Sequence, residues 1–193
     1  MSSPTYRIKL KKMTVTFKDV CVITALYDLM HFWVVEHDWQ PRFGHQEGSI
    51  ETMFYVNRAN PKIMNYNIWW RLQKKINAQI RFVMNIDFIG LGISQVEVVW
   101  QGKKYKAYKG EFTFNLNGAV EIDPEGKWKK SRIVSKFSDY LIKKLLRQNM
   151  IDYRNELIRE MTEFQGFIKS FFGQYQNMQV SETMEPKRGF GFS

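Results

Sequence analysis

The sequence predicts an α+β protein in which a curved antiparallel sheet wraps a long C-terminal helix. From Ile68 to Ile122, apolar and polar residues alternate through several short runs, which is the pattern of strands with one buried face. From about Arg132 to Phe172, apolar residues recur with the period of an amphipathic helix. The chain has 193 residues, of which 44% are hydrophobic, so it can bury the core of one domain. We therefore expect a single domain over 1–172 and a flexible, polar tail over 173–193.

The first elements are expected to be a strand, a bend and a helix. Apolar and basic residues alternate from Tyr6 to Leu10, and the alternation changes parity at Lys11-Lys12, which predicts a bulge or bend before Met13–Phe17. Thr16–Asp19 resembles a capping box with Asp in the place of the usual Glu, so a helix is expected to follow as far as Val35. The apolar stripe of that helix comprises Val20, Ile23, Tyr27, Met30 and Val34.

A polar loop and the first strands of the sheet follow. Residues 37–50 contain one proline and two glycines and are expected to form a loop, whereas Ile50–Asn57 reads as a short strand that ends before Asn60-Pro61. Two alternating runs, 68–76 and 80–88, are then separated by Asn77-Ala78, which predicts a tight hairpin turn.

Glycines separate the strands that are expected in the second half of the sheet. Gly90-Leu91-Gly92 is expected to end the run that precedes it, and a new strand reaches Trp100. Gln101-Gly102 predicts a hairpin turn into Lys103–Tyr108, and after Gly110 a last strand extends from Phe112 to Ile122.

The C-terminal helix is expected to cover this sheet. Asp123–Gly126 reads as a turn before it, and Gly173 stands where a glycine commonly ends a helix. A continuous helix over 132–172 would be about 60 Å long, so we expect a break near Gln148–Ile151 or a protruding end. The apolar seam of this helix comprises Met150, Leu157, Met161, Phe164, Ile168 and Phe171.

The side chains between sheet and helix form either a filled core or an apolar cavity. Trp69 and Trp70 are adjacent, so at most one of them can point inward. The residues predicted to line this core or cavity are Trp70, Phe82, Met84, Ile86, Phe112, Phe114, Leu157, Met161 and Phe164.

The chain is basic, with a formal net charge of +10, and residues 101–150 hold twelve Lys or Arg against five Asp or Glu. A field of this sign attracts polyanions such as nucleic acid, an anionic membrane or an acidic partner. A solvated basic surface that only maintains solubility has the same composition. The candidate nucleic-acid-binding residues are Lys103, Lys104, Lys106, Lys109, Lys127, Trp128, Lys129, Lys130, Arg132 and Lys136.

Strand, helix, consecutive antiparallel strands and a long C-terminal helix, in that order over residues 5–172, resemble the START-like (SRPBCC, helix-grip) superfamily. The resemblance implies a curved sheet that wraps the C-terminal helix and leaves an apolar cavity between them. The stretch from Lys109 through Asp123–Trp128, with the basic helix after it, is also similar to small archaeal proteins of unknown function.

Residues with catalytic or metal-binding chemistry are sparse. His31, His37 and His45 lack the i, i+4 spacing of helical metal ligands, and Cys21 is expected to be a buried, inert thiol. Gly90-Leu91-Gly92 lacks the third glycine of a dinucleotide-binding loop. Arg188–Phe192 matches the opening of an RNA-recognition hallmark without the strand that continues it. We expect no catalytic residue, no metal and no cofactor.

A non-catalytic binding function is therefore expected. The leading hypothesis is docking on an anionic macromolecule, RNA or a ribonucleoprotein first, through residues 103–136. The alternative is a START-like carrier that holds an apolar small molecule or lipid between the sheet and the C-terminal helix. A homodimer through that helix is a third hypothesis. A single cysteine, no apolar signal region and no bilayer-spanning stretch indicate a cytoplasmic protein without a transmembrane segment.

Overall fold

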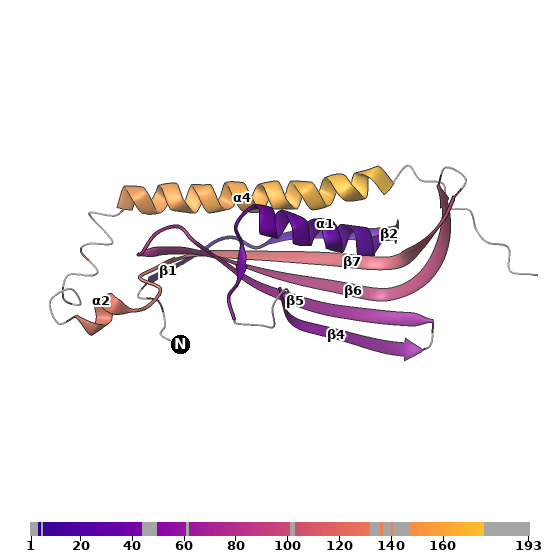
Figure 1. The fold of residues 1–193 in the computed structure, drawn as a ribbon, viewed down its shortest axis with the longest axis horizontal. Coiled ribbons are helices and arrows are strands. Elements are labelled where there is room, and N and C mark those ends of the chain that lie inside the picture. Colours follow the sequence, from indigo (N-terminus) through magenta and orange to yellow (C-terminus); the bar gives the residue numbers. More distant parts are fainter. Residues whose placement is uncertain are drawn as a thin grey trace, which may run out of the picture.

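The computed structural model describes residues 6–43, 50–60, 62–100, 103–131 and 147–175, together with Pro4, Lys136 and Tyr140. Within this part of the chain, seven strands form one antiparallel sheet. Helices α1 (Ile23–Glu36) and α4 (Arg147–Tyr175) lie on one face of that sheet (Figure 1). The predicted fold class, α+β of helix-grip type, is confirmed.

The sheet is built from a central pair of long strands and shorter strands at both edges. Its order is β1-β7-β6-β5-β3, with β2 also pairing with β7 and β4 also pairing with β5. The strands are β1 (Tyr6–Lys9), β2 (Met13–Cys21), β3 (Gln40–Pro41), β4 (Glu51–Asn60), β5 (Ile63–Lys75), β6 (Ile80–Trp100) and β7 (Lys103–Ile122).

The parity change near the N-terminus is a bulge, as predicted. Lys9 pairs with Ala119 and Met13 with Leu116, so the edge strand holds one residue more than β7 over this interval. The Leu10 amide still donates to the Gly118 carbonyl at 2.9 Å. An extra residue of this kind bends an edge strand and increases its twist.

The predicted start of the first helix is wrong. Thr16–Asp19 belongs to β2, which pairs with β7 as far as Cys21, and α1 begins only at Ile23. The Asp19 carboxylate accepts a hydrogen bond from the adjacent Val20 amide at 2.8 Å instead of capping a helix. Pairing with the long neighbour β7 therefore overrides the local capping pattern. Within the predicted loop 37–50, Gln40–Pro41 forms a short strand beside β5.

The glycines between the predicted strands of the sheet interrupt fewer strands than expected. The turn at Asn77 is confirmed, since its side-chain oxygen accepts from the Gln79 and Ile80 amides at 2.8 and 2.9 Å. Gly90–Gly92, in contrast, does not end a strand: β6 continues through it, with a register shift between Leu91 and Ser94.

Gly92 has φ +63°, a conformation that glycine adopts without strain and other residues rarely do. The two strands that the sequence predicts on either side of it are therefore one bulged strand. Strand β7 likewise passes through Gly110 without a break. Figure 1 shows β6 and β7 bending upward together toward their shared turn, past α1. The predicted turn at Gln101-Gly102 lies outside the described residues.

The C-terminal helix α4 comprises Arg147–Tyr175 and is continuous over these 29 residues, which span about 44 Å. It has no break within Gln148–Ile151, whereas the chain just before Arg147 lies outside the described residues. Because α4 includes Gly173, the expected end at that glycine is wrong. The positions between 132 and 146, apart from Lys136 and Tyr140, and the tail from 176 onward lie outside the described residues.

The turn before the short helix α2 (Lys127–Lys130) is confirmed. The Gly126 amide donates to the Asp123 carbonyl at 2.9 Å. The Asp123 carboxylate accepts from the Lys127 and Trp128 amides at 2.8 Å each. Asp123 thus closes the turn with its backbone carbonyl and caps the first amides of α2 with its side chain.

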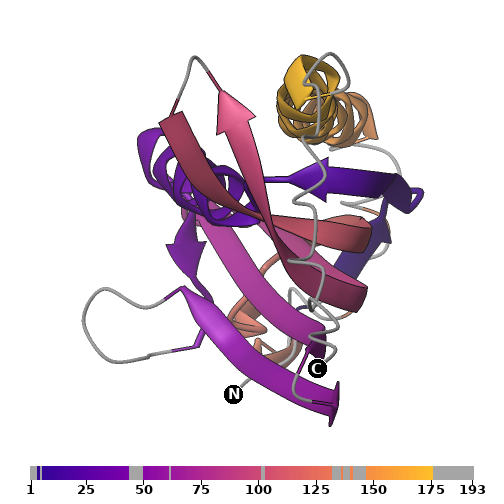
Figure 2. The ribbon, with the colours of Figure 1, turned by 90° about the vertical axis from the view of Figure 1, so that its right-hand side faces the viewer.

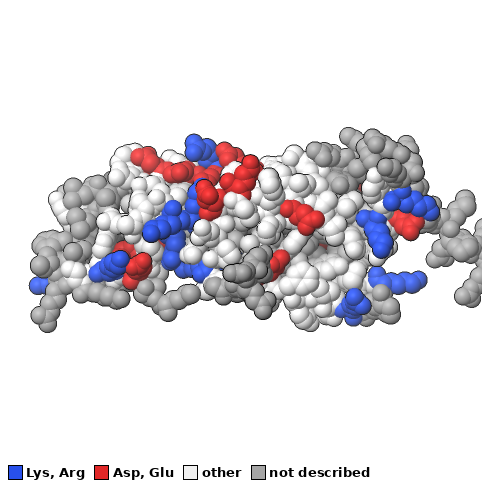
Figure 3. Space-filling model, in the orientation of Figure 1, with Lys and Arg blue, Asp and Glu red and all other residues white. Residues whose placement is uncertain are grey.

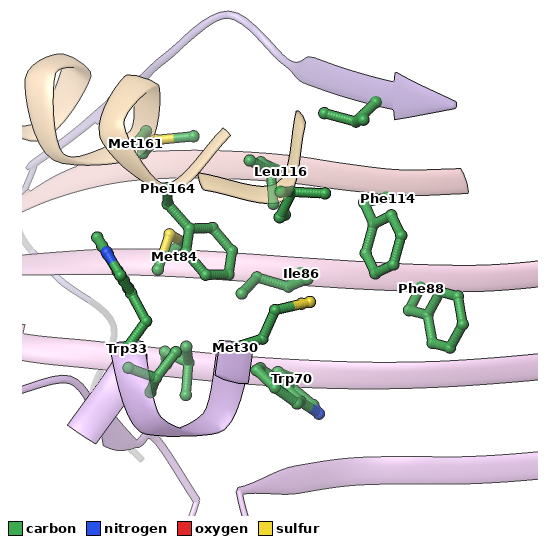
Figure 4. Close-up of a cluster of buried hydrophobic side chains, with 14 of the residues drawn as sticks. Met30, Trp33, Trp70, Met84, Ile86, Phe88, Phe114, Leu116, Met161 and Phe164 are labelled. Atoms are coloured by element: carbon green, nitrogen blue, oxygen red, sulfur yellow. The ribbon is translucent and has the colours of Figure 1, made fainter. Parts of the chain in front are cut away.

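The core between the sheet and the two helices is closely filled. Phe164 of α4 lies 4.6 Å from the Trp33 ring of α1, and Figure 4 shows both beside Met84 and Ile86 of the sheet. Trp70 is 2% exposed, whereas Trp69 lies on the outer face beneath the Arg71 guanidinium. The residues at the predicted core or cavity positions are all buried: Trp70, Phe82, Met84, Ile86, Phe112, Phe114, Leu157, Met161 and Phe164.

The outer face of the sheet carries a buried carboxylate. Glu121 of β7 is 0% exposed and is surrounded by three arginines. Arg81 binds it at 2.6 Å, Arg42 at 3.0 Å, and the Nε of Arg7 lies 3.7 Å away. These arginines come from β6, from the segment after β3 and from β1, so this cluster links strands that are distant in the sequence.

The reaction rate of the Cys21 thiol tests whether the end of β2 is buried. The thiol is 0% exposed, and burial, with a smaller contribution from the Asp19 charge, raises its pKa from 9.0 to about 12. We expect a thiol reagent at pH 8 to react with the native protein roughly a hundredfold more slowly than with protein unfolded in guanidinium, because reaction requires local opening. Equal rates in the two states would contradict this placement of Cys21.

Candidate ligand-binding pocket

A pocket of about 250 Å³ lies between the first turns of α1 and the strands β4 to β7. Five of its lining residues are aromatic, two are isoleucines, and Thr24 and Asp28 complete the wall. The aromatic and aliphatic lining residues are Tyr27, Phe54, Tyr66, Phe88, Tyr108, Ile23 and Ile68. No residue of α4 is among them. The pocket is thus separate from the filled space between the sheet and the C-terminal helix.

The pocket exists because α1 is much shorter than the strands beneath it. Its 14 residues span about 21 Å, whereas the 21 residues of β6 would span about 70 Å if straight. Ile68 and Phe88 form the floor and lie on the same sheet face as the core residues Trp70 and Ile86. Phe88 stacks on Phe114 at 4.6 Å, and Figure 4 shows this pair at the margin of the core. The floor therefore continues the hydrophobic core beyond the start of the helix.

Tyr27 fixes the helix to the sheet at one wall. Its hydroxyl donates to the Glu51 carboxylate of β4 and accepts from the Trp70 indole N–H at 3.2 Å. Burial, together with the hydrogen bond to Glu51, raises the pKa of this phenol above its ordinary value. Because the hydroxyl donates its proton to Glu51, a ligand in the pocket would contact the aromatic ring of Tyr27.

Tyr66 forms the wall on β5, where glycine makes room for it. A Cβ on Gly90 of the neighbouring strand would lie 3.1 Å from the Tyr66 ring. The Tyr66 hydroxyl donates to the Met64 sulfur at 3.5 Å. Burial and the nearby Tyr108 raise the pKa of Tyr66, while Arg58 acts in the opposite direction. A larger residue at position 90 would push this ring out of place.

The rim of the pocket is more open and carries its polar groups. Thr24 and Asp28 are exposed on α1, and Phe54 of β4 is 59% exposed. Asp28 is the one charged residue among the described lining residues, and it has no ion-pair partner in the part of the chain that the structure describes. A ligand entering here meets a carboxylate first and aromatic rings next.

Among the described residues, the candidate nucleic-acid-binding side chains on β7 and α2 form two separate groups. Lys104, Lys106 and Lys109 are exposed on β7 near its turn with β6, whereas Lys127 and Trp128 belong to α2, at the other end of the molecule (Figure 1). On the face shown in Figure 3, basic side chains are interspersed with acidic ones. The described members of the set therefore lie at opposite ends of the molecule.

Some of these cations are also partly neutralised. Lys104 lies 3.7 Å from Glu97. Lys127 lies 2.8 Å from Glu125, and the hydrogen bond between them raises the pKa of Lys127 and lowers the pKa of Glu125. Trp128 is half-buried against the core, and Lys136 is exposed. Arg132 and the side chains of Lys103, Lys129 and Lys130 lie outside the described residues. Docking on RNA or a ribonucleoprotein stays a prediction.

His37 packs against its own helix, and His31 lies half-buried on α1. His37 stacks on Trp33 at 3.8 Å and its Nδ1 lies 2.8 Å from the Trp33 carbonyl, whereas His45 and Arg188–Phe192 lie outside the described residues. Across the described ranges, no group of three His, Cys, Asp or Glu residues could hold a metal ion. No helix within those ranges is long and apolar enough to cross a bilayer.

The exposed sides of the two long helices differ in character. The exposed face of α4 is mostly polar, whereas α1 exposes Leu29, Phe32 and Val35. Figure 2 shows the two helices from the end of the molecule, side by side over the sheet. A homodimer through the C-terminal helix stays a prediction.

Comparison with known proteins adds little to this geometry. No protein-family model matches the chain, and no curated protein matches it. Among solved structures, the di-domain ARO/CYC StfQ from the steffimycin biosynthetic pathway is similar to 84% of this chain, with 9% identity and a TM-score of 0.17. The chain covers 52% of that protein's chain. A TM-score this low carries no argument, so the site has to be interpreted from its own chemistry.

Proposed function

We propose that this protein is a non-catalytic binding protein of START-like type that holds a small apolar or aromatic molecule. The observation that supports the proposal is the pocket between α1 and β4–β7, which is lined by five aromatic side chains and two isoleucines. Ligand sites in proteins are concave and mostly apolar, with a few polar groups that orient the ligand. This pocket has those properties, at a position different from the one expected between the sheet and the C-terminal helix.

The size of the pocket limits the ligand. A volume of about 250 Å³ lies just below the range of about 300–1,000 Å³ that holds drug-sized ligands. A molecule of one or two rings fits, whereas a complete sterol or phospholipid would remain largely outside. The described lining residues include no Cys, His, Ser or Lys. The carboxylate of Asp28 and the hydroxyl of Thr24 lie exposed at the rim. The hydroxyls of Tyr27 and Tyr66 are hydrogen-bonded to Glu51 and Met64, so no nucleophile is paired with a base in the pocket. Binding without chemistry is therefore the function that this site supports best.

Binding of small aromatic probes tests this proposal. We expect indole, naphthalene or tert-butylbenzene to bind saturably, and a probe present at 100 times its Kd to raise the free energy of unfolding by about 2.7 kcal/mol. Replacing Phe54 with Ala removes one wall and should weaken binding about tenfold. Titration by ligand-observed NMR and a thermal unfolding series measure both effects.

Tyr55→Ala is the matched control for the Phe54 variant. Tyr55 adjoins Phe54 on β4 and is similarly exposed, at 56% against 59%, but it does not line the pocket. Probe affinity should therefore be unchanged in this variant. Failure of every probe to bind saturably, or equal losses in the two variants, would overturn the proposed function.

A further inference from the structure

We infer that the pocket selects an organic cation, with an ammonium or methylammonium group held among its aromatic rings and Asp28 as the counter-charge. This inference rests on the proposed function, because it names the class of molecule that the same pocket takes. It follows from the composition of the walls, the placement of charge around them and the hydrogen bonding of Tyr27.

The walls match the chemistry of cation recognition. A cation within about 6 Å of an aromatic centroid is attracted by the negative potential of the ring face, and quaternary ammonium groups are commonly bound inside clusters of such rings. Here Tyr27, Phe54, Tyr66, Phe88 and Tyr108 line one small pocket and come from α1 and from each of the strands β4 to β7. Rings from five elements can contact a compact cation from several sides.

The charges around the pocket also favour a cation. Although the chain carries a formal charge of +10, no Lys or Arg is among the described lining residues. Asp28 lies at the rim, and the Glu51 carboxylate lies behind Tyr27 as its hydrogen-bond acceptor. That hydrogen bond increases the electron density of the Tyr27 ring, which strengthens its attraction for a cation.

Two positive charges oppose this field. The amino end of α1 contributes a partial charge of about +0.5, and Arg58 of β4 is close enough to lower the pKa of Tyr66. Glu51 and Asp28 carry two full negative charges, and Asp28 is a described lining residue whereas Arg58 is not. The balance at the rim therefore favours a cation over an anion.

Isosteric probes separate charge from shape. Phenyltrimethylammonium and tert-butylbenzene differ by one atom, a positively charged nitrogen in place of carbon. Benzenesulfonate provides the anionic comparison. We expect the cation to bind at least about tenfold more tightly than tert-butylbenzene, which corresponds to about 1.4 kcal/mol. Benzenesulfonate should bind more weakly than both. Calorimetry or NMR titration of the full chain at low ionic strength measures the three affinities.

Asp28→Asn tests the counter-charge without changing the size of the side chain. It should weaken phenyltrimethylammonium binding about threefold to tenfold and leave tert-butylbenzene binding unchanged. The neutral probe thereby reports that the pocket of the variant is intact. Glu36→Gln is the matched control, because Glu36 is an exposed acid at the other end of α1 and should affect neither probe.

The outcomes separate this inference from the proposed function. Equal affinity for the cation and tert-butylbenzene, or tighter binding of benzenesulfonate, would overturn cation selection and leave the proposed function in place. An Asp28→Asn variant that binds the cation as well as the wild type would remove Asp28 as counter-charge and overturn the inference as stated. If no probe binds, the proposed function falls and this inference with it.

Discussion

Replacing Glu121 with Gln is expected to lower the free energy of unfolding by about 3–5 kcal/mol, the cost of breaking a buried ion pair by removing one partner. Glu121 is fully buried, and its two oxygens lie 2.6 to 3.7 Å from three arginines. Gln preserves the shape of the side chain but leaves three positive charges together around a neutral group. Because native domains are stable by only about 5–15 kcal/mol, a loss of this size would be a large fraction of the total.

Glu111→Gln is the matched control for this prediction. Glu111 is on the same strand and pairs with Lys18 at 3.1 Å, but the Lys18 side chain is exposed and that of Glu111 is partly exposed. An exposed pair of this kind contributes about 0–1 kcal/mol. Urea unfolding followed by tryptophan fluorescence measures both variants. Similar small losses in the two would show that the arginines are released into water, and that Glu121 does not hold the outer face together.

Phe114→Ala is expected to lower the free energy of unfolding by about 3–5 kcal/mol, because it removes a large core ring and leaves a cavity. The Phe114 ring is 1% exposed. It stacks on Phe88 at 4.6 Å and lies 6.0 Å from the Phe172 ring of α4. The substitution therefore removes the contact that joins the pocket floor to the C-terminal helix.

Thr113→Ala is the matched control for Phe114. Thr113 is the preceding residue of β7 and points to the opposite face, where its hydroxyl lies 3.3 Å from that of Thr16. A change of about 0.5 kcal/mol or less is expected there. The same urea series measures both. A Phe114→Ala loss no larger than the Thr113→Ala loss would mean that the buried face of β7 is assigned to the wrong side.

Alternation and helical periodicity were sufficient to predict the sheet, its buried face and the seam of the C-terminal helix. Trp69 and Trp70 show why. Neighbouring residues on a strand point to opposite faces, so the only question was which of the two faces the core. The long strands were harder to predict. Gly90–Gly92 has the composition of a strand end, but its backbone hydrogen bonds to both neighbours continue across a bulge, and only the neighbouring strands provide those partners.

The pocket could not be predicted in this way. Ile68 and Phe88 have the same parity as the core residues Trp70 and Ile86, and a period of two does not indicate whether a helix or an open space covers a given position. Thr24, Asp28, Phe54, Tyr66 and Tyr108 had no sequence signal at all. They form a site because α1 starts only at Ile23. The preceding residues belong to β2, although the capping pattern at Thr16–Asp19 predicted that the helix would begin there.

The sequence by itself determined which faces are apolar, because that depends on the spacing of residues along each element. The tertiary structure alone decided where the elements end relative to one another, and with it the pocket and the Glu121 cluster. In the sequence, Glu121 is indistinguishable from the other polar residues on the outer face of the sheet. Its partners Arg7, Arg42 and Arg81 are 40 or more positions away in the chain. Contacts between such distant residues depend on strand order and register, which no local pattern encodes.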